Sequence, residues 1–324
     1  MNIFRKIKNG DKRIVYCGHV AIMEYCPKKY LKLFPEDEEK ILLDEIFRII
    51  GKRHDSVIYL RAGLGEAYIF YFMLQDYIKK NKFKNPCIIC HRKFYNELSQ
   101  MFASDIPFYH VDIPQNKLNQ TLRKRNIKYR GIAFNVNPST LPEILVVWEN
   151  YRAKTENRHY IDVLKELNSI PTLTPKLPII SEETKQTALN KVKDLNINNF
   201  VFLIPEANFF HLLNDAIWKN IKNNLKQKGY DVLVNTPELT LSEAYYLATL
   251  SKSIIGIRGG LSEVLSTVNV SKHIIYTRNK ARVLNSLQIF TLKEYPLVNK
   301  ETVFEYECFN EDPTEVINNI LSNF

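Results

Sequence analysis

Short apolar runs alternate with amphipathic stretches along the chain, most clearly in its second half. The apolar runs, each typical of a buried strand, are residues 200–204, 231–234, 253–257 and 273–276. The stretches with helical periodicity are residues 181–195, 212–228, 241–251 and 261–268. Ser181 followed by two glutamates predicts a capped helix start. Strands that alternate with such helices form a parallel sheet covered on both faces.

The first half repeats this alternation less regularly. We predict strands over residues 13–19, 56–61, 87–90, 108–112 and 131–135. We predict helices over residues 36–50, 68–80, 93–101 and 159–167. The acidic residues 36–39 would lie in the first turn of their helix, where the helix dipole stabilises negative charge.

Three prolines, Pro171, Pro175 and Pro178, separate the halves and predict an extended connector. We therefore expect a first domain over residues 1–170, a hinge over 171–183 and a second domain over 184–324. The expected fold class is α/β, with two Rossmann-like, doubly wound parallel-sheet domains facing a cleft. Ligands bind such sheets outside the carboxyl ends of the strands.

Composition and charge limit the classes of protein to which this chain could belong. With 324 residues, 45% of them hydrophobic, the chain is predicted to fold rather than stay disordered. No apolar run is long enough to cross a bilayer and the first residues lack a secretion signal, so we expect a cytoplasmic protein. Residues 1–175 hold 29 Lys and Arg against 19 Asp and Glu, whereas residues 176–324 hold 16 of each.

The excess positive charge of the first half predicts an anionic partner for it. This charge is densest over residues 123–130. An anionic membrane surface, reached as a peripheral protein at the inner face of the membrane, and a phosphorylated substrate both fit; a merely solvated surface is the alternative. Nucleic acid is not expected, because no nucleic-acid-binding motif accompanies the charge. The five cysteines form no disulfide framework, and Cys87 and Cys90, although spaced for metal or redox chemistry, are predicted to pack in a core strand.

Glycine is scarce, with ten residues, and four of them fall in two strand-to-helix turns. The first turn carries Arg61, Gly63, Gly65 and Glu66. Its glycines would let the backbone lie against a ligand, and the Glu66 carboxylate could accept a proton from an attacking hydroxyl. The alternative is a helix-start glutamate that contacts no ligand. The spacing matches neither a dinucleotide-binding fingerprint nor a Walker A loop.

The second turn carries the stronger signal, because an arginine precedes two glycines at a helix start. Arg258 would offer a planar array of donors to phosphate, and the helix-start N–H groups near Gly259, Gly260 and Leu261 would bind a diphosphate. Ser262 would cap the helix or contact phosphate. Glu263 could accept hydrogen bonds from a ribose or sugar hydroxyl, and a structural corner is the alternative.

A third turn follows the strand at 200–204 and carries Pro205, Glu206 and Asn208. Its polar groups could hydrogen-bond a base or a sugar, or cap the next segment. His211 follows this turn and could lie near the same ligand.

Together these turns, in this order, resemble those of GT-B glycosyltransferases. The matching segments are the strand with Gly63-Leu-Gly-Glu66, then 200–208, a helix with Trp218, 226–235 and 254–263. They are most similar to the heptosyltransferase-like group and related enzymes of bacterial surface polysaccharide synthesis. That group has an aspartate where this chain has Glu66. The turn with Arg258 also differs from that group's and is closer to the arginine-containing turn of fucosyltransferase-like members.

The resemblance implies transfer of a sugar from a nucleotide-diphosphate donor, held by the second half, to a glycan or lipid-linked acceptor, held by the first. Glu66 would be the general base, Arg258 would stabilise the leaving diphosphate, and Arg61 could assist on closure. No metal ion and no cofactor are expected. Two alternatives stay open: a sugar-nucleotide epimerase or hydrolase of the same fold, and a non-catalytic basic module that binds anionic lipid or nucleic acid.

Overall fold

A computed structural model describes a large part of the chain, and in it the chain divides into two compact units. Unit 1 comprises residues 1–99 and 103–174, and unit 2 comprises residues 100–102 and 175–324. The described residues are 4–6, 13–17, 20–23, 56–60, 64–90, 94–110, 133–135, 144–146, 158–167, 173, 175–207, 210–278, 286–309 and 312–324. Each unit is described by itself.

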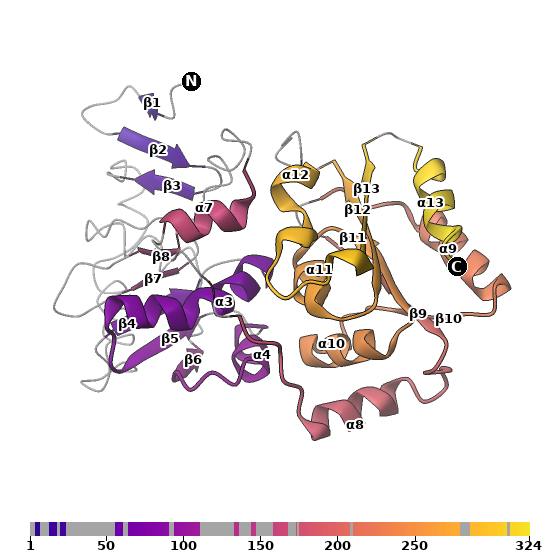
Figure 1. Cartoon of the computed structure of the whole chain (residues 1–324), viewed down its shortest axis with the longest axis horizontal. Coiled ribbons are helices and arrows are strands. Elements are labelled where there is room, and N and C mark those ends of the chain that lie inside the picture. Colours follow the sequence, from indigo (N-terminus) through magenta and orange to yellow (C-terminus); the bar gives the residue numbers. More distant parts are fainter. Residues whose placement is uncertain are drawn as a thin grey trace, which may run out of the picture. The chain divides into compact units, whose positions relative to one another are not determined.

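Unit 1 contains a mixed five-stranded sheet in the order β6-β5-β4-β7-β8 (Figure 1). Its strands are β4 Ser56–Leu60, β5 Pro86–Cys90, β6 Phe108–His110, β7 Ala133–Asn135 and β8 Ile144–Val146. Its described helices are α3 Leu64–Asn81, α7 Tyr160–Leu167 and all but the last two residues of α4 Phe94–Met101. β4, β5 and β6 run parallel, whereas β7 is antiparallel to both β4 and β8. The side chains of Tyr68 and Phe72 in α3 are almost wholly buried.

The expectation of a purely parallel sheet is therefore wrong for unit 1. The predicted strand at 13–19 belongs instead to a separate antiparallel sheet of β1 Phe4–Lys6, β2 Arg13–Cys17 and β3 Val20–Met23. Only two residues separate β2 from β3, and so short a connection can join antiparallel strands but not parallel ones. The helix predicted over residues 36–50 lies outside the described residues.

Unit 2 confirms the predicted parallel sheet, with five strands in the order β10-β9-β11-β12-β13. The strands are β9 Phe200–Ile204, β10 Asp231–Val234, β11 Ser253–Ile257, β12 Ser271–Thr277 and β13 Val303–Cys308. The α-helices are α8 Glu182–Lys191, α9 Asp215–Gln227, α10 Leu241–Leu250, α11 Gly260–Val264, α12 Ser286–Phe290 and α13 Thr314–Leu321. The short 3₁₀ turns are η2 Leu265–Thr267, η3 Leu292–Glu294 and η4 Lys300–Thr302.

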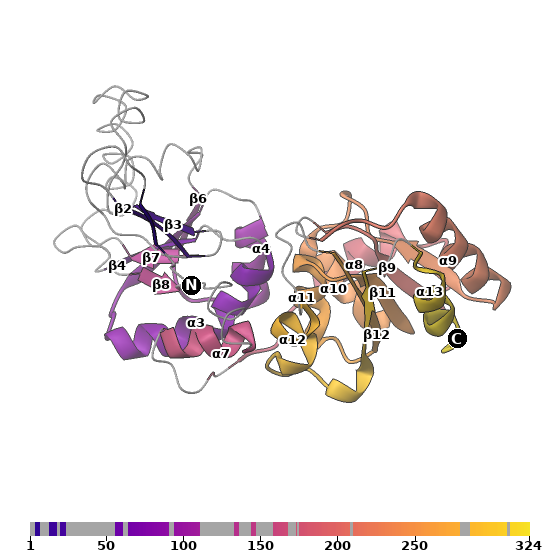
Figure 2. The same cartoon turned by 90° about the horizontal axis from the view of Figure 1, so that it is seen from above.

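Helices cover both faces of this sheet, with α9 and α13 on one side and α10, α11 and α12 on the other (Figure 2). Val201, Leu203, Ile255 and Ile275 pack in one buried cluster with apolar residues of α9 and α13. Each such side chain contributes roughly 1.5–3 kcal/mol by leaving water. Ser181 caps α8 as predicted, its Oγ accepting a hydrogen bond from the N–H of Thr184.

Two further expectations concern possible metal and membrane sites. Cys87 is fully buried in β5, as predicted for a core cysteine. Within the described ranges, no three His, Cys, Asp or Glu side chains cluster in a way that could hold a metal ion. Nor does any helix there combine the length and the apolar character needed to cross a bilayer.

Candidate functional site

The second and third predicted turns meet at the carboxyl edge of the unit 2 sheet. They follow β11 and β9, which are neighbouring parallel strands with Gly256 paired to Ile204. A Cβ atom on Gly259 would lie only 3.1 Å from the Cβ of Ala207, so glycine lets the two turns pack together. Glu206 is exposed at this edge, and Pro205 is half-buried.

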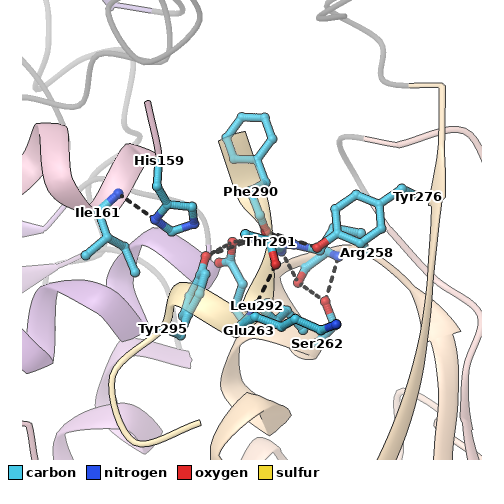
Figure 3. A network of polar contacts seen from close by, with 12 residues as sticks. His159, Ile161, Arg258, Ser262, Glu263, Tyr276, Phe290, Thr291, Leu292 and Tyr295 are labelled. Atoms are coloured by element: carbon cyan, nitrogen blue, oxygen red, sulfur yellow. Dashed lines mark hydrogen bonds and ion pairs between the residues drawn. The ribbon is translucent and has the colours of Figure 1, made fainter. Parts of the chain in front are cut away.

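Arg258, the first residue after β11, is 2% exposed and its guanidinium is hydrogen-bonded to protein groups (Figure 3). Nε donates to the carbonyl of Phe290 at 3.1 Å, and Nη1 donates to the carbonyl of Gly259 at 3.1 Å. Nη2 donates to Glu263 Oε1 at 2.5 Å and to the Tyr295 hydroxyl at 2.9 Å. The guanidinium therefore holds the turn and a later segment of the chain together.

This geometry differs from the expected one, in which Arg258 and Glu263 face a ligand. Glu263 is 8% exposed, and its Oε1 also accepts a hydrogen bond from the Tyr295 hydroxyl at 2.8 Å. A buried ion pair with this many hydrogen bonds is a structural unit, because either charge alone would be costly to bury. In this structure both side chains are directed at protein groups.

At the start of α11, the backbone of Gly259 is hydrogen-bonded to a side chain, whereas the next two N–H groups have no described acceptor. Ser262 is buried; its Oγ accepts from the N–H of Gly259 at 2.9 Å and donates to the carbonyl of Gly259 at 2.7 Å. Of its two expected roles, Ser262 thus takes that of a cap. Gly260 and Leu261 are half-buried, and no described residue accepts a hydrogen bond from their N–H groups.

A half-buried carboxylate, which no motif in the sequence marks, holds the segment 290–295. Glu305 in β13 accepts hydrogen bonds from the Tyr276 hydroxyl at 2.6 Å, from Thr291 Oγ1 at 2.5 Å and from the N–H of Leu292 at 2.7 Å. Burial raises the pKa of Tyr276 well above its usual value, so its hydroxyl stays a donor. The carbonyl of Phe290 joins both networks, because Tyr276 and Arg258 both donate to it.

At the end of the next strand, β12, the backbone is tied to the loop that follows β9. The N–H of His211 donates to the carbonyl of Arg278 at 2.9 Å, and Thr277 Oγ1 donates to the carbonyl of His211 at 2.6 Å. Phe210 is buried with its ring edge-on to Tyr276, the ring centroids lying 6.1 Å apart. The side chains of Arg278 and His211 are exposed.

Lys272 is a second buried cation and lies near the opposite, amino end of β12. Its Nζ donates to the carbonyls of Val268 and Val270 at 2.5 and 2.8 Å and to Thr302 Oγ1 at 3.1 Å. Burial lowers the pKa of Lys272 to about 8. This lysine caps the end of the turn that follows α11, at the opposite end of β12 from the carboxyl edge of the sheet.

In unit 1 the glycine turn leads into α3 earlier than predicted. The helix begins at Leu64, so Gly65, which is buried, and Glu66 both lie in its first turn. The side chain of Glu66 lies outside what the structure describes. Arg61 and Gly63 in this turn, and Asn208 in the third turn, also lie outside the described residues.

Comparisons with known proteins place the fold. No family model matches the chain, and no curated protein matches its sequence. Among solved structures, the chain is similar to a glycosyl transferase of family 9 from Veillonella parvula, with a TM-score of 0.52 and 11% identity over 82% of this chain and 90% of that one. It is likewise similar to the ADP-heptose lipopolysaccharide heptosyltransferase II of E. coli, with a TM-score of 0.51 and 15% identity over 82% of this chain and 98% of that one.

The chain has the α/β fold of these glycosyltransferases. The resemblance expected from the sequence, to the heptosyltransferase-like group, is thereby confirmed at the level of the fold. At such identities the likeness assigns no residue roles.

Proposed function

We propose that the protein is a glycosyltransferase that moves a sugar from a nucleotide-diphosphate donor to a glycan or lipid-linked acceptor of a bacterial surface polysaccharide. The observation that carries the proposal is the fold, which is shared over 82% of the chain with glycosyltransferases. One of these is named for ADP-heptose, a nucleotide-diphosphate sugar. In this proposal unit 2 binds the donor and unit 1 binds the acceptor.

The proposed donor site is the carboxyl edge of the unit 2 sheet. Ligands of parallel α/β sheets bind at this edge, and here the glycine turn packs against the turn that follows β9. The N–H groups of Gly260 and Leu261 would donate to phosphate oxygens. Pro205, Glu206 and Asn208 would contact the base or the sugar.

Arg258 has a different role in this proposal from the one expected from the sequence. Its donors bind Glu263, Tyr295 and two carbonyls, so it would fix the conformation of the glycine turn before the donor arrives. A turn that is already fixed needs no reorganisation as charge develops on the leaving group. We therefore propose that Arg258 and Glu263 are positioning residues.

The proposed reaction transfers the sugar between two oxygens. The oxygen of an acceptor hydroxyl forms a bond to the anomeric carbon as the bond from that carbon to the diphosphate oxygen breaks. Glu66 would take the hydroxyl proton, and the nucleoside diphosphate would leave with the bonding electron pair. We propose that no metal ion takes part, so EDTA should leave turnover unchanged.

A thermal-shift screen of the full chain against ADP, GDP, UDP and CDP tests the donor class. A ligand at a hundredfold excess over its Kd stabilises the native state by about 2.7 kcal/mol, which raises the melting temperature measurably. We expect one of the four to do so. Stabilisation by none of them would contradict the proposal.

Turnover then tests the role of Glu66. The release of nucleoside diphosphate from the matching sugar nucleotide is measured with and without a lipid-linked glycan fraction. We expect the glycan-dependent release to fall by roughly 10²–10⁴-fold in Glu66→Gln, with nucleotide binding retained. The control is Glu183→Gln, the same change in the first turn of α8, where Glu183 is exposed. Release that is fast without any glycan and unaffected by Glu66→Gln would favour a hydrolase instead.

A further inference from the structure

Arg278 and His211 bring two exposed, nitrogen-bearing side chains together beside the proposed donor site. They come from different loops, the one after β12 and the one after β9. The N–H of His211 donates to the carbonyl of Arg278, and the hydroxyl of the preceding Thr277 donates to the carbonyl of His211. Phe210, 3% exposed, anchors the second loop by packing its ring against Tyr276. The pairing of these two residues is therefore built into the fold.

The register of the sheet places Arg278 at the same edge as the glycine turn. β11 and β12 are parallel neighbours with Ile257 paired to Ile275, and the N–H of Arg258 donates to the carbonyl of Ile275 at 2.9 Å. Arg278 follows Ile275 by three residues, so it leaves the sheet where the chain turns through Gly259 and Gly260. Parallel strands end together at the edge where ligands bind.

Arg278 is exposed, in contrast to the buried Arg258. Arg278 is exposed, and in the described part of the chain neither a carboxylate nor a carbonyl pairs with its side chain. A guanidinium presents a planar fork of N–H donors that matches two phosphate oxygens at once. A backbone held by neighbouring strands lowers the entropy lost when such a side chain binds.

We infer that Arg278 binds a phosphate of the nucleoside diphosphate and that His211 supplies a second donor to the same diphosphate. This inference rests on the proposed function and assigns the positive charge at the site to Arg278 in place of Arg258. The charge that accumulates on the departing diphosphate would then be met by an exposed group that can adjust to it.

Binding of the nucleoside diphosphate selected by the thermal-shift screen, measured by isothermal titration calorimetry, tests this role. We expect Arg278→Ala to weaken binding at least tenfold, Arg278→Lys to weaken it less, and His211→Ala to weaken it two- to fivefold. Inorganic pyrophosphate, used as a competitor, should lose affinity for Arg278→Ala in the same proportion, because it carries the phosphates without the base. The matched control is Lys252→Ala, which removes an exposed positive charge at the amino end of β11, the opposite edge of the same sheet.

The outcomes separate the two proposals. If the wild-type protein binds none of the four nucleotides, the proposed function and this inference both fail. If it binds one of them and Arg278→Ala binds as tightly as Lys252→Ala, the function stands and Arg278 is a solvated surface residue. The melting temperature without ligand should be the same in Arg278→Ala and wild type, which excludes a folding defect as the cause of weaker binding.

Discussion

Two arginines end neighbouring strands of one sheet, and the protein uses them in opposite ways. Arg258, after β11, is 2% exposed and donates to Glu263, Tyr295 and two carbonyls. Arg278, after β12, is exposed, and its carbonyl accepts a hydrogen bond from the N–H of His211. The comparison teaches that an arginine beside a glycine turn can serve the turn's own architecture, while an exposed arginine lies one strand away.

The largest expected effect is on stability, at the buried arginine. Arg258→Met leaves Glu263 as a buried charge without a counter-charge, so it should lower the free energy of unfolding by about 3–5 kcal/mol. Urea denaturation followed by circular dichroism measures it. A loss below about 1 kcal/mol would mean that the Arg258–Glu263 ion pair does not stabilise the turn that follows β11.

A substitution at Gly256, in the strand that precedes the buried arginine, should have a smaller effect on the free energy of unfolding. A Cβ on Gly256 would lie 1.8 Å from Ile204 Cγ1 and 2.7 Å from the Ile204 carbonyl oxygen. Gly256→Ala should therefore destabilise the protein by roughly 1–3 kcal/mol. Gly259→Ala, whose new Cβ would lie 3.1 Å from that of Ala207, should cost less in the same denaturation assay. The reverse order would show that the turn, not the strand, is the tighter part.

Lys272 extends the comparison to a buried cation whose described partners are two carbonyls and a threonine hydroxyl. Its pKa is lowered to about 8 by burial, so between pH 8 and the ordinary value of 10.5 the unfolded state holds a proton that the folded state has released. Stability contributed by this group therefore rises with pH across that window, by up to about 1.4 kcal/mol per pH unit. Lys272→Met should remove this slope in denaturation curves at pH 7.5 and 9.5. An unchanged slope would show that another group causes it.

The smallest expected effect is on stability at the exposed arginine. Arg278→Met removes a side chain with no described partner, so the free energy of unfolding should change by less than about 0.5 kcal/mol. This variant is the direct counterpart of Arg258→Met in the same assay. A loss similar to that of Arg258→Met would erase the contrast between the two sites.

The sequence predicted unit 2 better than unit 1, for physical reasons. β9 and β11 are almost entirely apolar because helices cover both faces of the sheet, and β10 has three consecutive apolar residues; the predicted bounds of all three agree with the structure. β13 was missed because Glu305 and Glu307 interrupt its apolar residues, so no continuous apolar run marks it. In unit 1, β7 lies beside β4 but runs antiparallel, and nothing in a single strand's composition encodes its direction.

The candidate site, too, was predicted only in part from the sequence. The two turns that meet at the sheet edge could be predicted, because glycines after apolar strands mark them. The burial of Arg258 could not, because its partners Phe290 and Tyr295 lie 32 and 37 residues away along the chain. Arg278 was overlooked because no glycine or motif accompanies it; only the strand register brings it to the edge.

Hydrogen–deuterium exchange of the full chain, with and without the nucleoside diphosphate found by the screen, tests the central claim most directly. If the donor binds at the carboxyl edge of the unit 2 sheet, exchange should slow in peptides covering residues 258–264 and 274–278. Slowed exchange confined to unit 1, or to the amino edge near residues 268–272, would contradict the account.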